Sequence, residues 1–369
     1  MMKPPVSEIT ARTESQGFYP NWMKTLALEK TAAWIKKIEV AGDTCAWHRI
    51  VGCALLVLVV LLFLSGAFLA FYYSPVPGAA YDSVDFTLFN APFGSIIKGV
   101  HHYAWNILLI LAIFHLARTF IAGAYRKPRQ LTWVSGVIIL VVLPLFIITG
   151  DLLPWDQKGY WSTQVRLSII ASVPFIGDMT VDLLRGGPLT GIVALTRFYV
   201  LHILFLPGLL IVLLAAHFHF IAQHGLAERV LARPAAVNRI PFWPRVIKRW
   251  LILFIFSVAL IALVSWYWPP PLGDPADPTD STYIPKPEWW VLFLNQLVAI
   301  FRGKWAIVGT TVIPGFLAAL LVTLPYLDRS SGSRLSQRKG VIIFAGVLAT
   351  VIIVLSMMGY LEHFGLPHA

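Results

Sequence analysis

Seven long apolar stretches constrain this chain of 369 residues more than any other feature. Each stretch is long enough to cross about 30 Å of hydrocarbon as a helix. The composition agrees, because 57% of the residues are hydrophobic and only 13% are charged, which is unlike a soluble domain of this size. We therefore predict an all-α integral membrane protein with seven transmembrane helices, at residues 50–73, 99–118, 133–150, 197–222, 250–268, 305–327 and 340–361.

The first 49 residues are mostly polar, so the first apolar stretch is not expected to be a cleaved signal peptide. Within this leader, residues 21–40 mix apolar and basic side chains at roughly helical spacing. This pattern favours an amphipathic helix on the membrane surface. A plain soluble leader is the alternative.

The net charge of +11 is a topology signal rather than a sign of nucleic-acid binding. Most lysines and arginines fall in the leader and in the loops around residues 126–129, 229–249 and 329–339. If the seven spans alternate in direction, the leader and these loops all lie on the same side of the membrane. The positive-inside rule then puts the N-terminus in the cytoplasm and the C-terminus outside. We expect no nucleic-acid partner.

The only cysteines are Cys45 and Cys53, and no CxxC or CxxCH motif occurs. The sequence therefore predicts neither a disulfide framework nor an ordinary covalent c-type haem.

Two of the apolar stretches each carry two histidines at matching spacing. His101 and His115 are 14 residues apart, about 40° short of four helical turns, so both leave one face about 21 Å apart. His202 and His217 are 15 residues apart, about 60° past four turns. His102 has the wrong phase and is a bystander. On antiparallel helices, His101 pairs with His202 on the outer side and His115 with His217 on the inner side.

Two histidines facing each other in an apolar bundle suit the iron of haem b, which takes one imidazole on each face. Zinc would need four protein ligands, or three and an open position. The alternative is that each histidine forms hydrogen bonds inside the bundle. The matching registers favour two bis-histidine haems.

Glycines repeat the histidine spacing on two neighbouring stretches and are expected to let a porphyrin approach the backbone. Ordinary close packing of membrane helices is the alternative explanation. These glycines are Gly52, Gly66, Gly136 and Gly150.

Three cations near the helix ends are expected to bind the haem propionates: Lys98, Arg118 and Arg197. Snorkelling to lipid phosphate is the alternative.

Several sequence motifs of this chain resemble motifs of cytochrome b from the quinol-oxidising bc-type complexes. "YRKPRQLTWVSGV", "LPWDQKGYW", "LLRGG" and "LTRFYVLH" match its four-helix part, and "DPADPTDSTYIPKPEWW" with "FLNQLVAIFR" matches the loop that leads into subunit IV. The likeness covers roughly residues 45–360. It is greatest to the chloroplast and cyanobacterial b6f-type protein, in which subunit IV is a separate chain; here both parts look fused.

The sequence pattern and the resemblance together predict four regions. They are a leader with a surface helix (1–49), a four-helix di-haem domain (50–225), a cytoplasmic linker (226–249) and a three-helix subunit IV-like domain (250–369).

The resemblance also implies a function. Such a subunit oxidises quinol at the outer face, passes electrons through two b haems to an inner quinone site, and so translocates protons. It works beside a Rieske iron–sulfur protein and a c-type cytochrome, as a homodimer, in a bacterial inner membrane or an equivalent energy-transducing membrane.

By the same resemblance, Glu288 of "PEWW" holds the position of the carboxylate at the outer quinol site, near Tyr160. Quinol oxidation releases protons, and a carboxylate within hydrogen-bond reach can accept one. A capping role in a turn is the alternative. The next 13 residues are too short to span the membrane and are expected to form an interfacial segment above the site.

This chain departs from the family pattern at several positions. Trp290 replaces a tyrosine, Lys98 replaces an arginine, and Asp151 replaces an aromatic residue, giving either a second proton carrier or a solvated helix end. Ile50 stands where the b6f branch attaches an extra haem, so we do not expect that haem. His224 is the candidate for the inner quinone site.

Two other functions share the four histidines. A di-haem, quinone-reactive membrane anchor of a dehydrogenase or reductase would not need the PEWW loop or the last three helices. A transporter with histidine proton relays would contain no haem.

Overall fold

The computed structural model describes residues 39–41, 51–224, 239–241, 247–330, 332 and 335–364. Seven helices in these ranges are long and apolar enough to cross a membrane, which confirms the predicted all-α membrane fold. They are α4 (Val51–Tyr72), α6 (Gly94–Ile121), α7 (Gln130–Asp151), the continuous run of α10 (Ile192–Val200), η3 (Leu201–Phe205) and α11 (Leu206–His224), α12 (Ile247–Tyr267), η7 (Val308–Val312) with α14 (Ile313–Leu327), and α15 (Lys339–Phe364).

Shorter helices connect these spans. They are α5 (Pro77–Phe89), α8 (Gln157–Ala171), α9 (Gly177–Arg185), η5 (Trp289–Val291), α13 (Leu292–Ile300), η6 (Gly303–Trp305) and η8 (Leu335–Gln337).

The chain divides into two compact units, one of Met1–Ile50 with Pro234–Ile255 and one of Val51–Arg233 with Phe256–Ala369. In the first unit, β1 (Glu39–Ala41) pairs antiparallel with β2 (Arg239–Pro241). The last two residues of the predicted surface helix belong to β1. The rest of that segment, and Cys45, lie outside the described residues.

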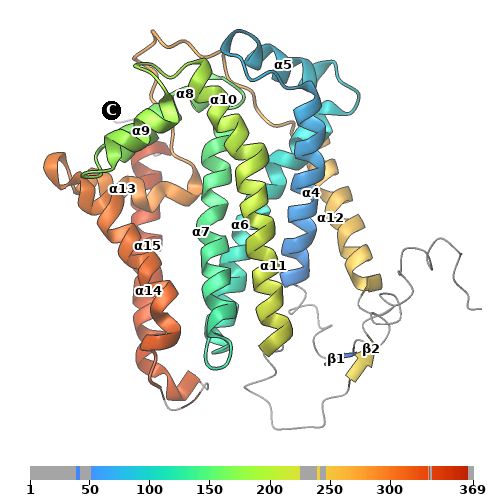
Figure 1. Ribbon diagram of the computed structural model, residues 1–369, viewed down its shortest axis with the longest axis vertical. Helices are drawn as coiled ribbons and strands as arrows, with labels where there is room; N and C mark the ends of the chain where they lie inside the picture. Colours follow the sequence, from blue (N-terminus) through green and yellow to red (C-terminus); the bar gives the residue numbers. More distant parts are fainter. Residues whose placement is uncertain are drawn as a thin grey trace, which may run out of the picture. The chain divides into compact units, whose positions relative to one another are not determined.

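Four spans of the second unit, α4, α6, α7 and α10–α11, run side by side (Figure 1). α4 packs along α6, and α7 packs along α11. On α4, Leu58 and Leu61 are buried while Phe63 and Leu64 are exposed, so the helix is apolar on all sides. A helix of this kind is stable in lipid, where its backbone groups are all satisfied internally.

A π-helical turn, η3, interrupts the fourth span at His202, and Leu206 N donates to Leu201 O across it. A π turn inserts one residue into an α-helix. The 15-residue interval between His202 and His217 begins inside this turn. The angle about the helix axis between His202 and His217 therefore approaches the angle between His101 and His115 on α6. As a result, the two helices present their histidines in the same register.

The connections α4–α6 and α7–α10 lie at one end of the bundle, here called the His101 end, with α5, α8 and α9 (Figure 1). The loop between α12 and η5 is fixed to the turn before α8. Asp156, the N-cap of α8, accepts a hydrogen bond from Gly273 N at 3.2 Å, and Ala276 N donates to Trp155 O at 3.0 Å. These bonds hold the loop that carries Glu288 against the His101 end.

Helix α14 packs beside α7 (Figure 1), and a buried arginine joins the two hairpins at the end opposite the His101 end. Arg338, only 1% exposed, donates to Phe120 O at 3.0 Å, Ile121 O at 2.6 Å and the Tyr125 hydroxyl at 3.1 Å. Tyr125 in turn donates to Asp328 Oδ2 at 2.6 Å. This network joins the α6–α7 turn to the α14–α15 connection.

Replacing Arg338 with methionine is expected to destabilise the protein by about 3 kcal/mol or more, because buried acceptors lose charge-assisted hydrogen bonds worth about 1.5–3 kcal/mol each. Denaturant unfolding in detergent measures the change. Arg329→Met is the matched control, since Arg329 is exposed in the same connection. Equal stability of the two variants would contradict the assigned role of Arg338.

Candidate functional site

Two pairs of histidines lie at two levels between α6 and the η3–α11 span. The ring centroids of His101 and His202 are 6.2 Å apart, and their planes cross at 69°. His115 and His217 lie close enough to interact electrostatically. The structure therefore brings together both pairs that the sequence spacing suggests.

Three of the four rings meet a side-chain hydroxyl at Nδ1. The contacts are Ser65 Oγ with His101 at 3.0 Å, Thr149 Oγ1 with His202 at 3.1 Å, and Ser135 Oγ with His217 at 2.9 Å.

These hydroxyls determine which ring nitrogen carries the proton. Each one also donates to a backbone carbonyl of its own helix: Leu61 O at 2.7 Å, Leu145 O at 2.7 Å and Thr132 O at 3.0 Å. A hydroxyl has one proton, so towards the ring it acts as acceptor and Nδ1–H is the donor. Nε2 then keeps its lone pair, which is the form of imidazole that ligates iron.

His115 differs from the other three rings. Among the described residues its Nδ1 is buried without a hydrogen-bond partner. The residue before Gly52 is Val51, which has no hydroxyl, whereas Ser or Thr precedes the other three glycines. Sequence reasoning missed these hydroxyls, although the dipeptides were a readable signal.

Each of the four glycines lies beside one histidine ring. The distance from a Cβ built on each glycine to the Cε1 atom of the neighbouring ring shows how close the approach is. It is 2.7 Å for Gly150 and His202, 3.1 Å for Gly66 and His101, 3.3 Å for Gly136 and His217, and 3.9 Å for Gly52 and His115. The missing side chains therefore make room for the rings that present Nε2.

Gly150→Ala is expected to displace the His202 ring and to lower haem content below half of wild type, because a tightly packed core does not absorb an added methyl group. Gly66→Ala should cause a smaller loss. Haem per chain in purified protein measures both. Gly208→Ala is the control, because nothing lies within 4 Å of a Cβ there. Full haem retention in Gly150→Ala would refute this prediction.

The three candidate propionate partners occupy different surroundings. Lys98 is the fifth residue of α6, and Arg118 lies in the last turn of that helix. Arg197 NH1 donates to Leu183 O at 2.5 Å and to Asp182 O at 3.2 Å, near the end of α9. A propionate would share the Arg197 guanidinium with these carbonyls.

A chain of charges lies at the His101 end and includes two predicted carboxylates. Glu288 forms a salt bridge and hydrogen bond with Lys158 Nζ. The same Nζ lies 3.6 Å from Asp151 Oδ1, and Arg166 donates to Asp151 Oδ2 at 2.6 Å. The side chains of Glu288 and Asp151 are only 21% and 14% exposed. Lysine 158 thus connects residues that lie far apart in the sequence.

Lys158 remains a cation in this arrangement. Burial lowers its pKa, but the Asp151 and Glu288 carboxylates and the hydrogen bond to Glu288 raise it further, so its pKa ends above the ordinary value. The Lys158 ammonium therefore lies between the side chains of Asp151 and Glu288.

The predicted interfacial segment forms η5 and α13, which pack on α15. Trp289 Nε1 donates to Asn106 Oδ1 of α6 at 2.8 Å, which ties the segment to the bundle. The Nε1 of Trp290 is buried, and in the described ranges it has no partner. The position that lacks the expected tyrosine hydroxyl therefore still offers a hydrogen-bond donor.

Tyr160 lies on α8 but is 2% exposed, with its ring against Trp155 and Trp161 in an apolar cluster. His224 is the last residue of α11, and its ring stacks with Phe220 at 6.5 Å. Cys53 lies on α4.

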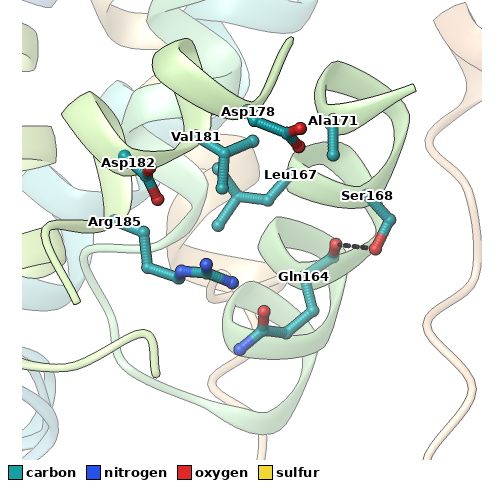
Figure 2. A pocket seen from close by; sticks show the side chains of 8 residues that line it. All are labelled: Gln164, Leu167, Ser168, Ala171, Asp178, Val181, Asp182 and Arg185. Carbon is teal, nitrogen blue, oxygen red and sulfur yellow. Dashed lines mark hydrogen bonds between the residues drawn. The ribbon is translucent and has the colours of Figure 1, made fainter. Parts of the chain in front are cut away.

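A separate half-open hollow of about 310 Å³ lies between α8 and α9 (Figure 2). Asp178, Asp182 and Arg185 line one side of it, and Gln164 and Ser168 line the other. It contains none of the residues predicted for the two sites above.

Comparison with known proteins identifies the family. A family profile described as "Cytochrome b(N-terminal)/b6/petB" matches residues 106–275. Cytochrome b6 of Prochlorococcus marinus (strain MIT 9303) is 39% identical over 215 residues, which are 58% of this chain and 98% of that protein. The chain belongs to the cytochrome b family. This confirms the resemblance seen in the motifs.

Cytochrome b6 of Synechococcus sp. (strain RCC307) is 41% identical to this cytochrome b over 172 residues, which are 47% of this chain and 79% of that protein. A solved chain of a "Hyperthermophilic respiratory Complex III" superimposes with a TM-score of 0.79 at 23% identity, covering 95% of this chain and 92% of that one. The second likeness shows that the shared fold includes the C-terminal helices.

Membership of the cytochrome b family implies binding of haem b. The observed residues fit such a group. Three rings have their Nε2 lone pair available, and glycines leave room beside all four rings.

Proposed function

We propose that this cytochrome b is the membrane subunit of a bc-type complex that oxidises quinol at the His101 end. The observation that carries the proposal is the position of Glu288. A loop fixed to the start of α8 brings this carboxylate beside Lys158 and Asp151, at the end of the bundle that holds His101 and His202.

Two haems b would be held by His101 with His202 and by His115 with His217. When bound, they supply one-electron redox centres at the two levels of the bundle. Ser65, Ser135 and Thr149 orient three of the ligand rings, and Lys98, Arg118 and Arg197 are the candidate partners for the propionates.

Glu288 is the proposed proton acceptor for the quinol. Each quinol releases two protons on oxidation, and a carboxylate within hydrogen-bond reach can take one of them in the reaction. Asp151, bound to Arg166, offers a second carboxylate on the same charge chain. The segment η5–α13 would cover the site, and Tyr160 would shape it from the α8 side.

The partners and orientation follow from this role. A Rieske iron–sulfur protein and a c-type cytochrome would accept electrons, the complex would be a homodimer, and a second quinone would be reduced at the opposite end, near His224. The distribution of basic residues supports a cytoplasmic N-terminus and an outer His101 end, so that proton release outside and uptake inside translocate charge.

The purified complex tests this proposal. Pyridine haemochrome analysis should give two b haems per chain and no covalent haem, and quinol should reduce a c-type cytochrome in a reaction sensitive to outer-site inhibitors. A di-haem anchor without bifurcation would contain the haems but be insensitive to those inhibitors. Protein without haem would refute both functions.

A further inference from the structure

Lys158 is a cation near the N-terminus of a helix, a position that the helix dipole disfavours. It is the second residue of α8, after the N-cap Asp156. The N-terminal end of a helix carries partial positive charge, so a cation there is unfavourable. The two carboxylate partners of Lys158, Asp151 and Glu288, offset this unfavourable interaction with the helix dipole.

The two partners are not equivalent. Arg166 already binds one oxygen of Asp151 at 2.6 Å, and Lys158 approaches the other only to 3.6 Å. The close contact of the ammonium is with Glu288. Lys158 is thus chiefly the counter-ion of Glu288, with Asp151 as a second partner within reach.

Other charged and titratable groups face this pair from the elements packed around it. They are Asp151 on α7, the α8 N-cap Asp156, Arg166 on α8, Lys98 and His102 on α6, and Tyr283 in the loop before η5. Lys158 is the cation bound to Glu288 among the residues that the structure describes.

We propose that Lys158 is a positioning residue for quinol oxidation: its ammonium pairs with the Glu288 carboxylate and orients it as a proton acceptor. The inference rests on the proposed function. In the step concerned, a quinol O–H bond breaks and an O–H bond forms on Glu288, while the electrons leave to the one-electron acceptors of the complex. Glu288 becomes neutral, and Asp151 remains as the counter-ion of Lys158.

The pH dependence of quinol oxidation tests the proposal. In Lys158→Met the Glu288 carboxylate loses its cation and takes up a proton more readily, so the acid limb of kcat/KM should move to higher pH. Relative activity at the acid end should fall about three- to tenfold. Lys158→Arg keeps the charge and should retain the wild-type profile. Lys286→Met is the control, because Lys286 is an exposed lysine of the same loop.

Infrared difference spectra give a second measurement that a merely structural role would not change. The carboxylic acid band of Glu288, assigned by its loss in Glu288→Gln, should persist to higher pH in Lys158→Met. Lys158→Gln repeats the test if the methionine variant loses haem.

The outcomes separate the two proposals. If Glu288→Gln is inactive but neither the profile nor the band changes in the lysine variants, the role of Lys158 is overturned and the proposed function remains. If all lysine variants, arginine included, lose activity equally at every pH, Lys158 is only structural and the proposal fails. If Glu288→Gln keeps full activity, the proposed function fails, and this inference with it.

Discussion

Replacing His202 with leucine is expected to remove one of the two proposed b-type haem signals and to halve the haem content of the purified protein. Leucine fills a similar volume but has no nitrogen to bind iron, and the ring that faces His101 at 6.2 Å is lost. Reduced-minus-oxidised spectra and pyridine haemochrome analysis measure the change. The haem at the His115–His217 level should remain.

His102→Leu is the matched control, because His102 neighbours a proposed ligand on α6 but packs its ring against Tyr103. It should keep both haems. Two intact signals in His202→Leu would show that this ring is not an iron ligand, and the di-haem assignment would then fail.

Glu288→Gln should lower quinol oxidation at least about 100-fold, the usual contribution of a general base. The amide keeps the size of the side chain but cannot accept the proton, and it also loses the ion pair with Lys158. Steady-state reduction of the c-type acceptor measures the loss.

Glu362→Gln is the control for this variant, since Glu362 is an exposed carboxylate near the end of α15. It should retain wild-type activity, and both variants should contain two haems. A Glu288→Gln protein with normal turnover would contradict the proton-acceptor role.

The seven spans were predictable because a membrane helix needs about 20 apolar residues in a row, a signal that depends on local sequence alone. The predicted start of the fourth span differs from the observed start. The sequence places it at residue 197, whereas helix α10 begins at Ile192. Arg197 interrupts the apolar run, but its guanidinium bonds to carbonyls near the end of α9.

Two features of the sites were beyond sequence reasoning for different physical reasons. The π turn at His202 depends on backbone hydrogen bonding that no residue type encodes. The ion pair of Lys158 with Glu288 joins residues 130 positions apart, and it forms only because the loop before η5 folds onto α8. Without the structure, Lys158 was only one of many lysines.

The three hydroxyls on α4 and α7 also bear on how the protein acquires its cofactors. Fixing a side chain for a ligand costs about 0.5–1.5 kcal/mol of rotational freedom, and the Nδ1 bonds of His101, His202 and His217 restrict that freedom. Both rings of the His101–His202 level therefore have such a bond, whereas, within the part of the chain that the structure describes, His217 alone has one at the other level. We expect assembly to fill the His101–His202 level first and the level containing His115 second.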